Sequence, residues 1–188
     1  MTVPALPLPT NPEGSPRELV SELGALVGEQ TAAGWCADLL AGAAPHDYVP
    51  MLPYLGRNCA VAAFDPRWHD YWPRSWGGRG LLYVWAGSAA VTVVEGLSDP
   101  HWRPAEMSLK VASRREIGEA APGAVLLVDH ELARVRSQAI RCLGQVGDTE
   151  HIAVVEPALD DEETQVRRAA VRALRRMAER LDIDATWD

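Results

Sequence analysis

The stretch VRSQAIRCL at residues 135–143 superposes on VRRAAVRAL at residues 166–174, with an offset of 166 − 135 = 31. Val, two Arg and Leu agree at identical positions. Three aspartates, Asp99, Asp129 and Asp160, follow one another at nearly the same interval. Each closes an apolar run and is followed by an arginine-bearing amphipathic stretch. This recurrence predicts a repeat protein in which each unit covers its neighbour's apolar face.

The apolar positions of these stretches follow the period of a helix. The last one places Val166, Ala170, Ala173, Leu174, Met177 and Leu181 in one stripe of a 3.6-residue helix. The sequence therefore predicts pairs of helices joined by a turn. We expect the apolar helices near residues 81–97, 121–128 and 149–159, and the amphipathic helices near 102–117, 133–146 and 163–181.

The N-terminal half is less regular. Ser15-Pro16-Arg17-Glu18 has the form of a capping box, so we expect a helix to begin there, with short helices near 35–40 and 47–55. Residues 64–80 hold three tryptophans, two prolines and several glycines, and we interpret them as an irregular insertion. The expected organisation is a tail at 1–14, one domain at 15–181 with degenerate pairs over 15–87 and clearer repeats over 88–181, and a tail at 182–188.

The pattern of Leu159-Asp160-Asp161 before the stretch 166–174, and of Gly144 to Asp148 after the stretch 135–143, resembles the short HEAT-repeat class that is also found in bilin-lyase-like proteins. The resemblance covers roughly residues 88–181. It implies an all-α fold, a right-handed α-solenoid of antiparallel helix pairs. It also implies a protein-interaction scaffold in which the second helix of each pair lines the concave surface.

Composition limits the function. The formal net charge is 18 − 26 = −8, which argues against a general binder of nucleic acid or anionic membranes. Cys36, Cys59 and Cys142 have neither disulfide-framework nor zinc-site spacing, so we expect no metal and a reducing cytoplasm. No signal peptide is recognisable, and the apolar run at 81–97 is too short and interrupted to span a bilayer. We expect no cofactor.

The arginines of the last amphipathic stretches are the first candidate binding residues. Residues 163–180 carry six arginines against two glutamates, a local charge of +4, and residues 131–146 carry +2. If the second helices face a concave surface, this surface accepts an acidic protein partner. The alternative is a solvated outer face that ends the stack. The candidates are Arg141, Arg168, Arg172, Arg175 and Arg176.

The tryptophans of the expected insertion are the second candidate. Trp68, Trp72 and Trp76 alternate with cationic and hydrogen-bonding residues, the mixture of interface hot spots. The alternative is that these rings fill the core between helices. By contrast, we expect Asp99, Asp129 and Asp160 to cap turns, and Arg103, Arg136 and Arg167 to pair with carboxylates of neighbouring units.

Three functions remain open at this point. The favoured one is a non-enzymatic adaptor that binds a protein. The second is a DNA-directed protein similar in outline to the alkylpurine DNA glycosylases. The resemblance to their tryptophans and carboxylate is weak and is limited to Trp102-Arg103, with Asp99 and Trp85 nearby. The third is a bilin-lyase-like accessory protein. A catalytic pairing of His69-Asp70 with Cys59 or Ser75 has no supporting motif.

Overall fold

The structure is a computed structural model, and it describes residues 3–57, 64, 69–184 and 187. Within these ranges every regular element is a helix, so the all-α prediction is confirmed. The chain divides into two compact units, Met1–Met107 and Ser108–Asp188. We describe each unit by itself.

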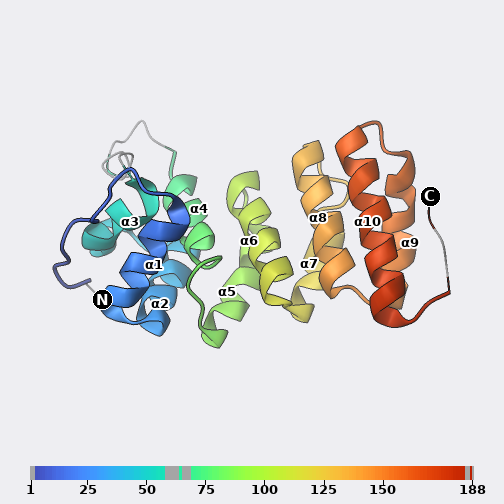
Figure 1. The fold of residues 1–188 in the computed structure, drawn as a ribbon. Helices are drawn as coiled ribbons and strands as arrows, with labels where there is room; N and C mark the ends of the chain where they lie inside the picture. Colours follow the sequence, from blue (N-terminus) through green and yellow to red (C-terminus); the bar gives the residue numbers. More distant parts are fainter. Residues whose placement is uncertain (1–2, 58–63, 65–68, 185–186, 188) are drawn as a thin grey trace. The chain divides into compact units, whose positions relative to one another are not determined.

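The first unit is built around a packed group of short helices (Figure 1). Ser15 begins the first of them as expected, because its Oγ accepts from the Glu18 N–H while the Glu18 carboxylate accepts from the Ser15 N–H. The largest buried side chains include Leu19, Leu39 and Tyr54. The elements are α1 Pro16–Val27, α2 Glu29–Leu40, η1 Pro45–Met51, α3 Leu52–Gly56, α4 Tyr71–Gly80, η3 Gly87–Ala89, α5 Ala90–Glu95 and η4 Gly96–Ser98.

Part of the expected insertion is a helix. Residues 71–80 form α4, which packs against α2, so the prediction of irregular structure up to Gly80 is wrong. The glycines that suggested a loop serve close packing instead. A Cβ on Gly77 would clash with the main-chain carbonyl oxygen of Cys36 in α2, so no side chain fits there. The apolar helix expected from residue 81 also begins later, with a 3₁₀ turn at Gly87.

The second unit contains the two amphipathic stretches that revealed the repeat. They form α8 and α10, which lie side by side (Figure 1). Gly144 of α8 meets α10 directly, since a Cβ there would stand 2.7 Å from the Ala173 Cα atom. The elements are η5 Gly118–Ala120, α7 Ala121–Val125, α8 Ala133–Val146, η6 Thr149–His151, α9 Ile152–Val155, η7 Glu156–Asp160 and α10 Thr164–Leu181. Helix α6, Trp102–Arg115, crosses the division between the units.

The helix starts follow one constant period. Helices α4, α6, α8 and α10 begin at positions 71, 102, 133 and 164, so the interval 102 − 71 = 31 separates each start from the next. Helices α5, α7 and α9 begin at 90, 121 and 152, which is the same interval. We call the first set the B helices and the second set the A helices. Residues that lie one period apart are therefore equivalent in this chain.

Candidate binding surface on the B helices

Buried arginine–aspartate pairs hold the turns in place. Arg136 donates from Nε to Asp161 Oδ2 over 2.8 Å and from Nη2 to Asp161 Oδ1 over 2.9 Å. Two periods earlier in the sequence, Arg74 makes the same bidentate contact with Asp99. Its Nε donates to Asp99 Oδ2 over 2.6 Å and its Nη2 donates to Asp99 Oδ1 over 3.3 Å. The hydrogen bond from Arg136 is the largest cause that lowers the pKa of Asp161. These pairs are structural, because their donors are already used.

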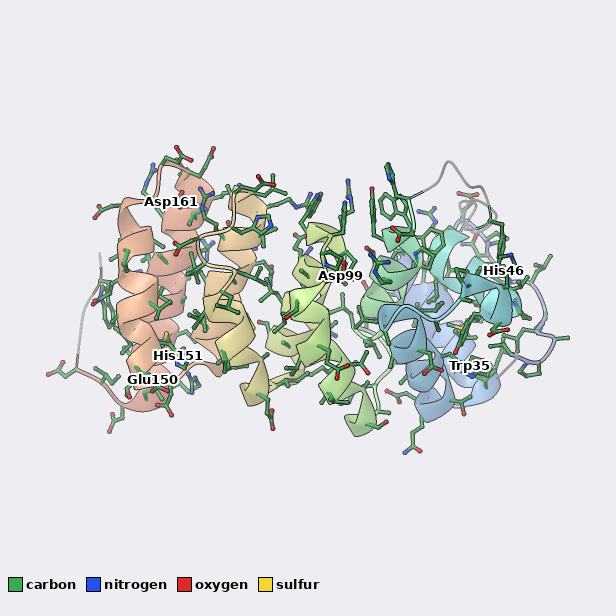
Figure 2. All side chains as sticks on the ribbon, turned by 180° about the vertical axis from the view of Figure 1, so that it is seen from behind. Trp35, His46, Asp99, Glu150, His151 and Asp161 are labelled. Atoms are coloured by element: carbon green, nitrogen blue, oxygen red, sulfur yellow. The ribbon has the colours of Figure 1, made fainter. Side chains whose placement is uncertain are left out.

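The register of the turn differs by one residue from the expectation. Asp99 does cap its turn, because its Oδ1 accepts from the His101 N–H. The equivalent acceptors are His130, which takes the Leu132 N–H, and Asp161, which takes the Glu163 N–H. Asp129 and Asp160 are therefore not the caps, and the true capping positions are one period apart throughout. Figure 2 shows Asp161 near the upper ends of the helices of the second unit and Glu150 and His151 near their lower ends.

The predicted arginine pairing holds for only one of its three arginines. Arg136 binds a carboxylate of the following turn, as expected. Arg167 instead donates to the main-chain carbonyls of Asp161 and Glu162. Arg103 stacks on aromatic rings, and its buried Nε has no hydrogen-bond partner among the described residues.

Cations recur at equivalent positions of the B helices in the second unit. Lys110, Arg141 and Arg172 share one position, each one period after the last. Three further arginines lie seven residues before or four after this position, which places them on the same helix face. We call the set the basic face, and it consists of Lys110, Arg114, Arg134, Arg141, Arg172 and Arg176. All are exposed except Lys110, which is half-buried.

Two carboxylates border the basic face near the C-terminal ends of the B helices. Glu116, just after α6, accepts a hydrogen bond of 2.7 Å from the Gln145 amide of α8. This contact fixes the end of α6 beside the end of α8. Glu179 is exposed on the last turns of α10. The cations at the middle position of each helix therefore form the most uniformly basic part of the face.

The five predicted arginines are all exposed, but they belong to two surfaces. Arg141, Arg172 and Arg176 lie on the basic face. Arg168 and Arg175 occupy the positions that Ser137 and Gly144 fill in α8, where both residues are buried and Gly144 meets α10. Arg168 and Arg175 thus mark the side of α10 that would carry a following B helix. Arg175 also donates from Nε to the Trp187 carbonyl over 2.9 Å.

The predicted tryptophans also separate. Trp76 is only 4% exposed, and its ring fills the space beside Gly56, where a Cβ would come within 2.9 Å. Trp76 is therefore a core residue, which is the alternative that the sequence left open. Trp72 is half-buried at the surface of the first unit. Trp68 lies outside the described residues, as does Cys59.

Trp72 is part of an aromatic cluster around one arginine. The Arg103 guanidinium lies 4.3 Å from the Trp102 ring centre and 4.8 Å from that of Trp72. His101 stacks on Tyr71 with ring centres 3.5 Å apart, and burial followed by the Arg103 charge lowers the pKa of His101. The sequence carried a signal for this cluster, since Tyr71-Trp72 and Trp102-Arg103 are one period apart.

A cavity of about 400 Å³ lies elsewhere in the first unit. Asp70, Arg74, Glu95 and Asp99 contribute its charged lining, and Figure 2 labels Asp99. The guanidinium of Arg74 already binds Asp99 and Asp70. The cavity therefore offers no available cation to an anionic ligand, and its carboxylates are partly neutralised.

Comparison with known proteins identifies the repeat. Residues 121–185 match the family of HEAT repeats. The matched segment lies within the second unit. The fold is similar to a chain of the complex of CpcE and CpcF of phycocyanin lyase from Nostoc sp., with a TM-score of 0.59 and 19% identity over 95% of this chain and 71% of that chain. No curated protein matches the sequence significantly.

Neither a Ser75–His69 pair nor a cluster of metal-ligating side chains is present in the described part of the chain. The buried Ser75 Oγ has no hydrogen-bond partner among the described residues, so it forms no pair with His69. Within the same residues no three His, Cys, Asp or Glu side chains gather as metal ligands. The helices there are also too short or too polar to cross a membrane.

Proposed function

We propose that this chain is a non-enzymatic HEAT-repeat scaffold that binds an acidic protein segment through its basic face. The observation that carries the proposal is the recurrence of Lys110, Arg141 and Arg172 at one position of three B helices. Five of the six cations on this face are exposed, in a chain whose formal net charge is −8. A guanidinium binds a carboxylate through two parallel N–H donors, which favours acidic ligands on such a face.

The net negative charge favours a protein over a nucleic acid. A long polyanion would meet the basic face but also the acidic remainder of the surface, where the turn residues Asp160 to Glu163 are all acidic. Binding of nucleic acid depends on a wide positive field that this chain does not provide. A short acidic segment can reach the basic face alone.

A matched pair of variants tests the proposal. In the first, Arg141→Glu, Arg172→Glu and Arg176→Glu reverse three charges of the basic face. In the second, Arg17→Glu and Arg175→Glu reverse two exposed charges outside it. Both are used with the full chain as affinity bait in lysate of its source organism. A protein captured by the natural chain and by the second variant, but lost with the first, supports the proposal.

Two outcomes contradict this function. One is capture of nucleic acid that washes off as salt is raised, which is the behaviour of phosphate contacts. The other is a partner that is retained by the first variant, because the basic face would then be dispensable. Circular dichroism first checks that both variants have the same helical content as the natural chain.

The fold similarity to a chain of the phycocyanin lyase complex favours a second candidate, an accessory role in attaching a bilin to a protein. Mixing the chain with a linear tetrapyrrole tests this candidate directly. A saturable change in the visible absorption spectrum would support this candidate, and an unchanged spectrum would contradict it.

A further inference from the structure

We propose that the segment bound by the basic face is an extended peptide with an acidic side chain at every third residue, one for each B helix. The inference rests on the proposed function and adds the conformation and spacing of the ligand. It follows from the positions of Lys110, Arg141 and Arg172, which we call the rungs.

The rungs are evenly spaced along the sequence of the second unit. They occupy one position of three successive B helices, and these helices begin one period apart without any insertion. Gly144 holds α8 close to α10, because any Cβ there would lie 2.7 Å from the Ala173 Cα atom. The hydrogen bond from Gln145 to Glu116 fixes the end of α6 beside α8. Helices packed side by side have axes about 8–10 Å apart, so we expect the bases of the rungs to repeat at about that distance.

An extended chain of the polyproline II type has the matching repeat. It has three residues per turn and rises about 3.1 Å per residue, so every third side chain returns to the same face after about 9 Å. In a β-strand, side chains on one face repeat after only about 7 Å. A carboxylate at every second residue would therefore fall out of register with the rungs.

The hydrogen-bonding capacity of the rungs favours an extended ligand over a helical one. Each guanidinium has five N–H donors, and a carboxylate uses two of them. The remaining donors of Arg141 and Arg172 can bind main-chain carbonyls, which an extended peptide leaves available and a helical peptide uses internally. A helix with an acid at every seventh residue has a similar repeat of about 10.5 Å but lacks these carbonyls.

Four labelled peptides of equal length and net charge test the inference with the full chain. Three share one composition of glutamate, proline and serine, with glutamate at every third residue, at every second residue, or in one block. The fourth is a helix-forming peptide with glutamate at every seventh residue. Fluorescence anisotropy gives each dissociation constant at low and at physiological ionic strength, for the natural chain and for the variants Arg141→Gln, Arg172→Gln and Arg175→Gln.

We expect the every-third peptide to bind about fivefold or more tightly than the other three, since each additional exposed ion pair multiplies affinity by about 1.5 to 5. Arg141→Gln should remove this preference, because it deletes the central rung. Arg175→Gln, which neutralises an arginine outside the face, should preserve it.

The remaining outcomes separate the two proposals. If all four peptides bind alike and Arg141→Gln weakens each of them, the basic face binds acidic ligands but the spacing inference is overturned. If the helical or the every-second peptide binds best, the inference is also overturned. If no peptide binds, or if neither Arg141→Gln nor Arg172→Gln weakens binding, both the inference and the proposed function fail.

Discussion

Gly144 of α8 lies so close to Ala173 of α10 that a Cβ at residue 144 would stand 2.7 Å from the Ala173 Cα atom, which leaves no room for a side chain. We expect Gly144→Ala to destabilise the protein by up to about 2 kcal/mol, because overpacking costs about 1–3 kcal/mol and the higher helix propensity of alanine recovers about 1 kcal/mol. Urea denaturation measures the change.

Gly34 provides the control for this substitution. It lies inside α2, and a Cβ there would have no neighbour within 4 Å. Gly34→Ala should therefore stabilise the protein by up to about 1 kcal/mol. Opposite signs for the two variants are required, and equal effects would contradict the close contact of α8 with α10.

Asp161→Asn should cost about 1–3 kcal/mol of unfolding free energy, because the largely buried Arg136 guanidinium loses its bidentate carboxylate and, among the described residues, keeps only the exposed carboxylate of Glu162 at 3.7 Å. Asp160→Asn is the matched control. Asp160 is the exposed neighbour that the sequence suggested as the cap, and its loss should change the free energy by less than about 0.5 kcal/mol. A larger cost for Asp160→Asn would contradict the register of the turn.

The stabilisation from Asp161 should also depend on pH. Its pKa is lowered in the folded state by the hydrogen bond from Arg136, so the unfolded chain binds the proton more tightly. The contribution is fully present above the unfolded pKa of about 4 and is lost as pH falls through the folded pKa. The difference between the natural protein and Asp161→Asn, measured in urea at several pH values, should be constant near neutrality and shrink below pH about 4.

Trp76→Ala should destabilise the protein by about 3–5 kcal/mol, because it empties a buried aromatic site. Trp72→Ala should cost about 1 kcal/mol, because the half-buried ring chiefly loses its contact with the Arg103 guanidinium. Chemical denaturation of the two variants measures both values. Equal costs would contradict the separation of these tryptophans into core and surface.

Cys36 and Cys142 should be unreactive toward thiol reagents in the folded protein. Burial raises the pKa of each thiol to about 12, so almost no thiolate forms near pH 8. The experiment uses the Cys59→Ser variant and a chromogenic disulfide reagent. We expect two thiols to react after addition of denaturant. Rapid reaction of either thiol before denaturation would contradict its burial.

The sequence predicted the repeat, the helix pairs and the capping box, because all three depend on local patterns. The apolar stripe of α10 and the Ser15–Glu18 box are visible without any tertiary contact. The sequence did not predict α4, because glycines normally interrupt helices. The need for glycine at residue 77 is clear only from the close approach of α2. The sequence reading also placed two turn caps one residue early. Asp129 and Asp160 directly precede the true caps His130 and Asp161, and only the hydrogen bonds of the folded turn distinguish the two neighbours.

The candidate surface was predicted only in part for a related reason. Helix periodicity shows that Arg168, Arg172, Arg175 and Arg176 point away from the apolar stripe. Periodicity alone does not show which of these arginines lie on the same face of the unit as the exposed residues of α8. That distinction needs the burial of Ser137 and Gly144, which is set by the next helix and not by the local sequence.

The constant period of the helix starts also governs how such a chain can change in length. Duplicating residues 118–148 in place would insert one whole helix pair, preserve every turn register and add one more arginine equivalent to Arg141. Deleting or adding a single residue within a B helix would rotate all later positions by about 100° around the helix axis. Growth by internal duplication is thus the route that lengthens the basic face while keeping its sequence period.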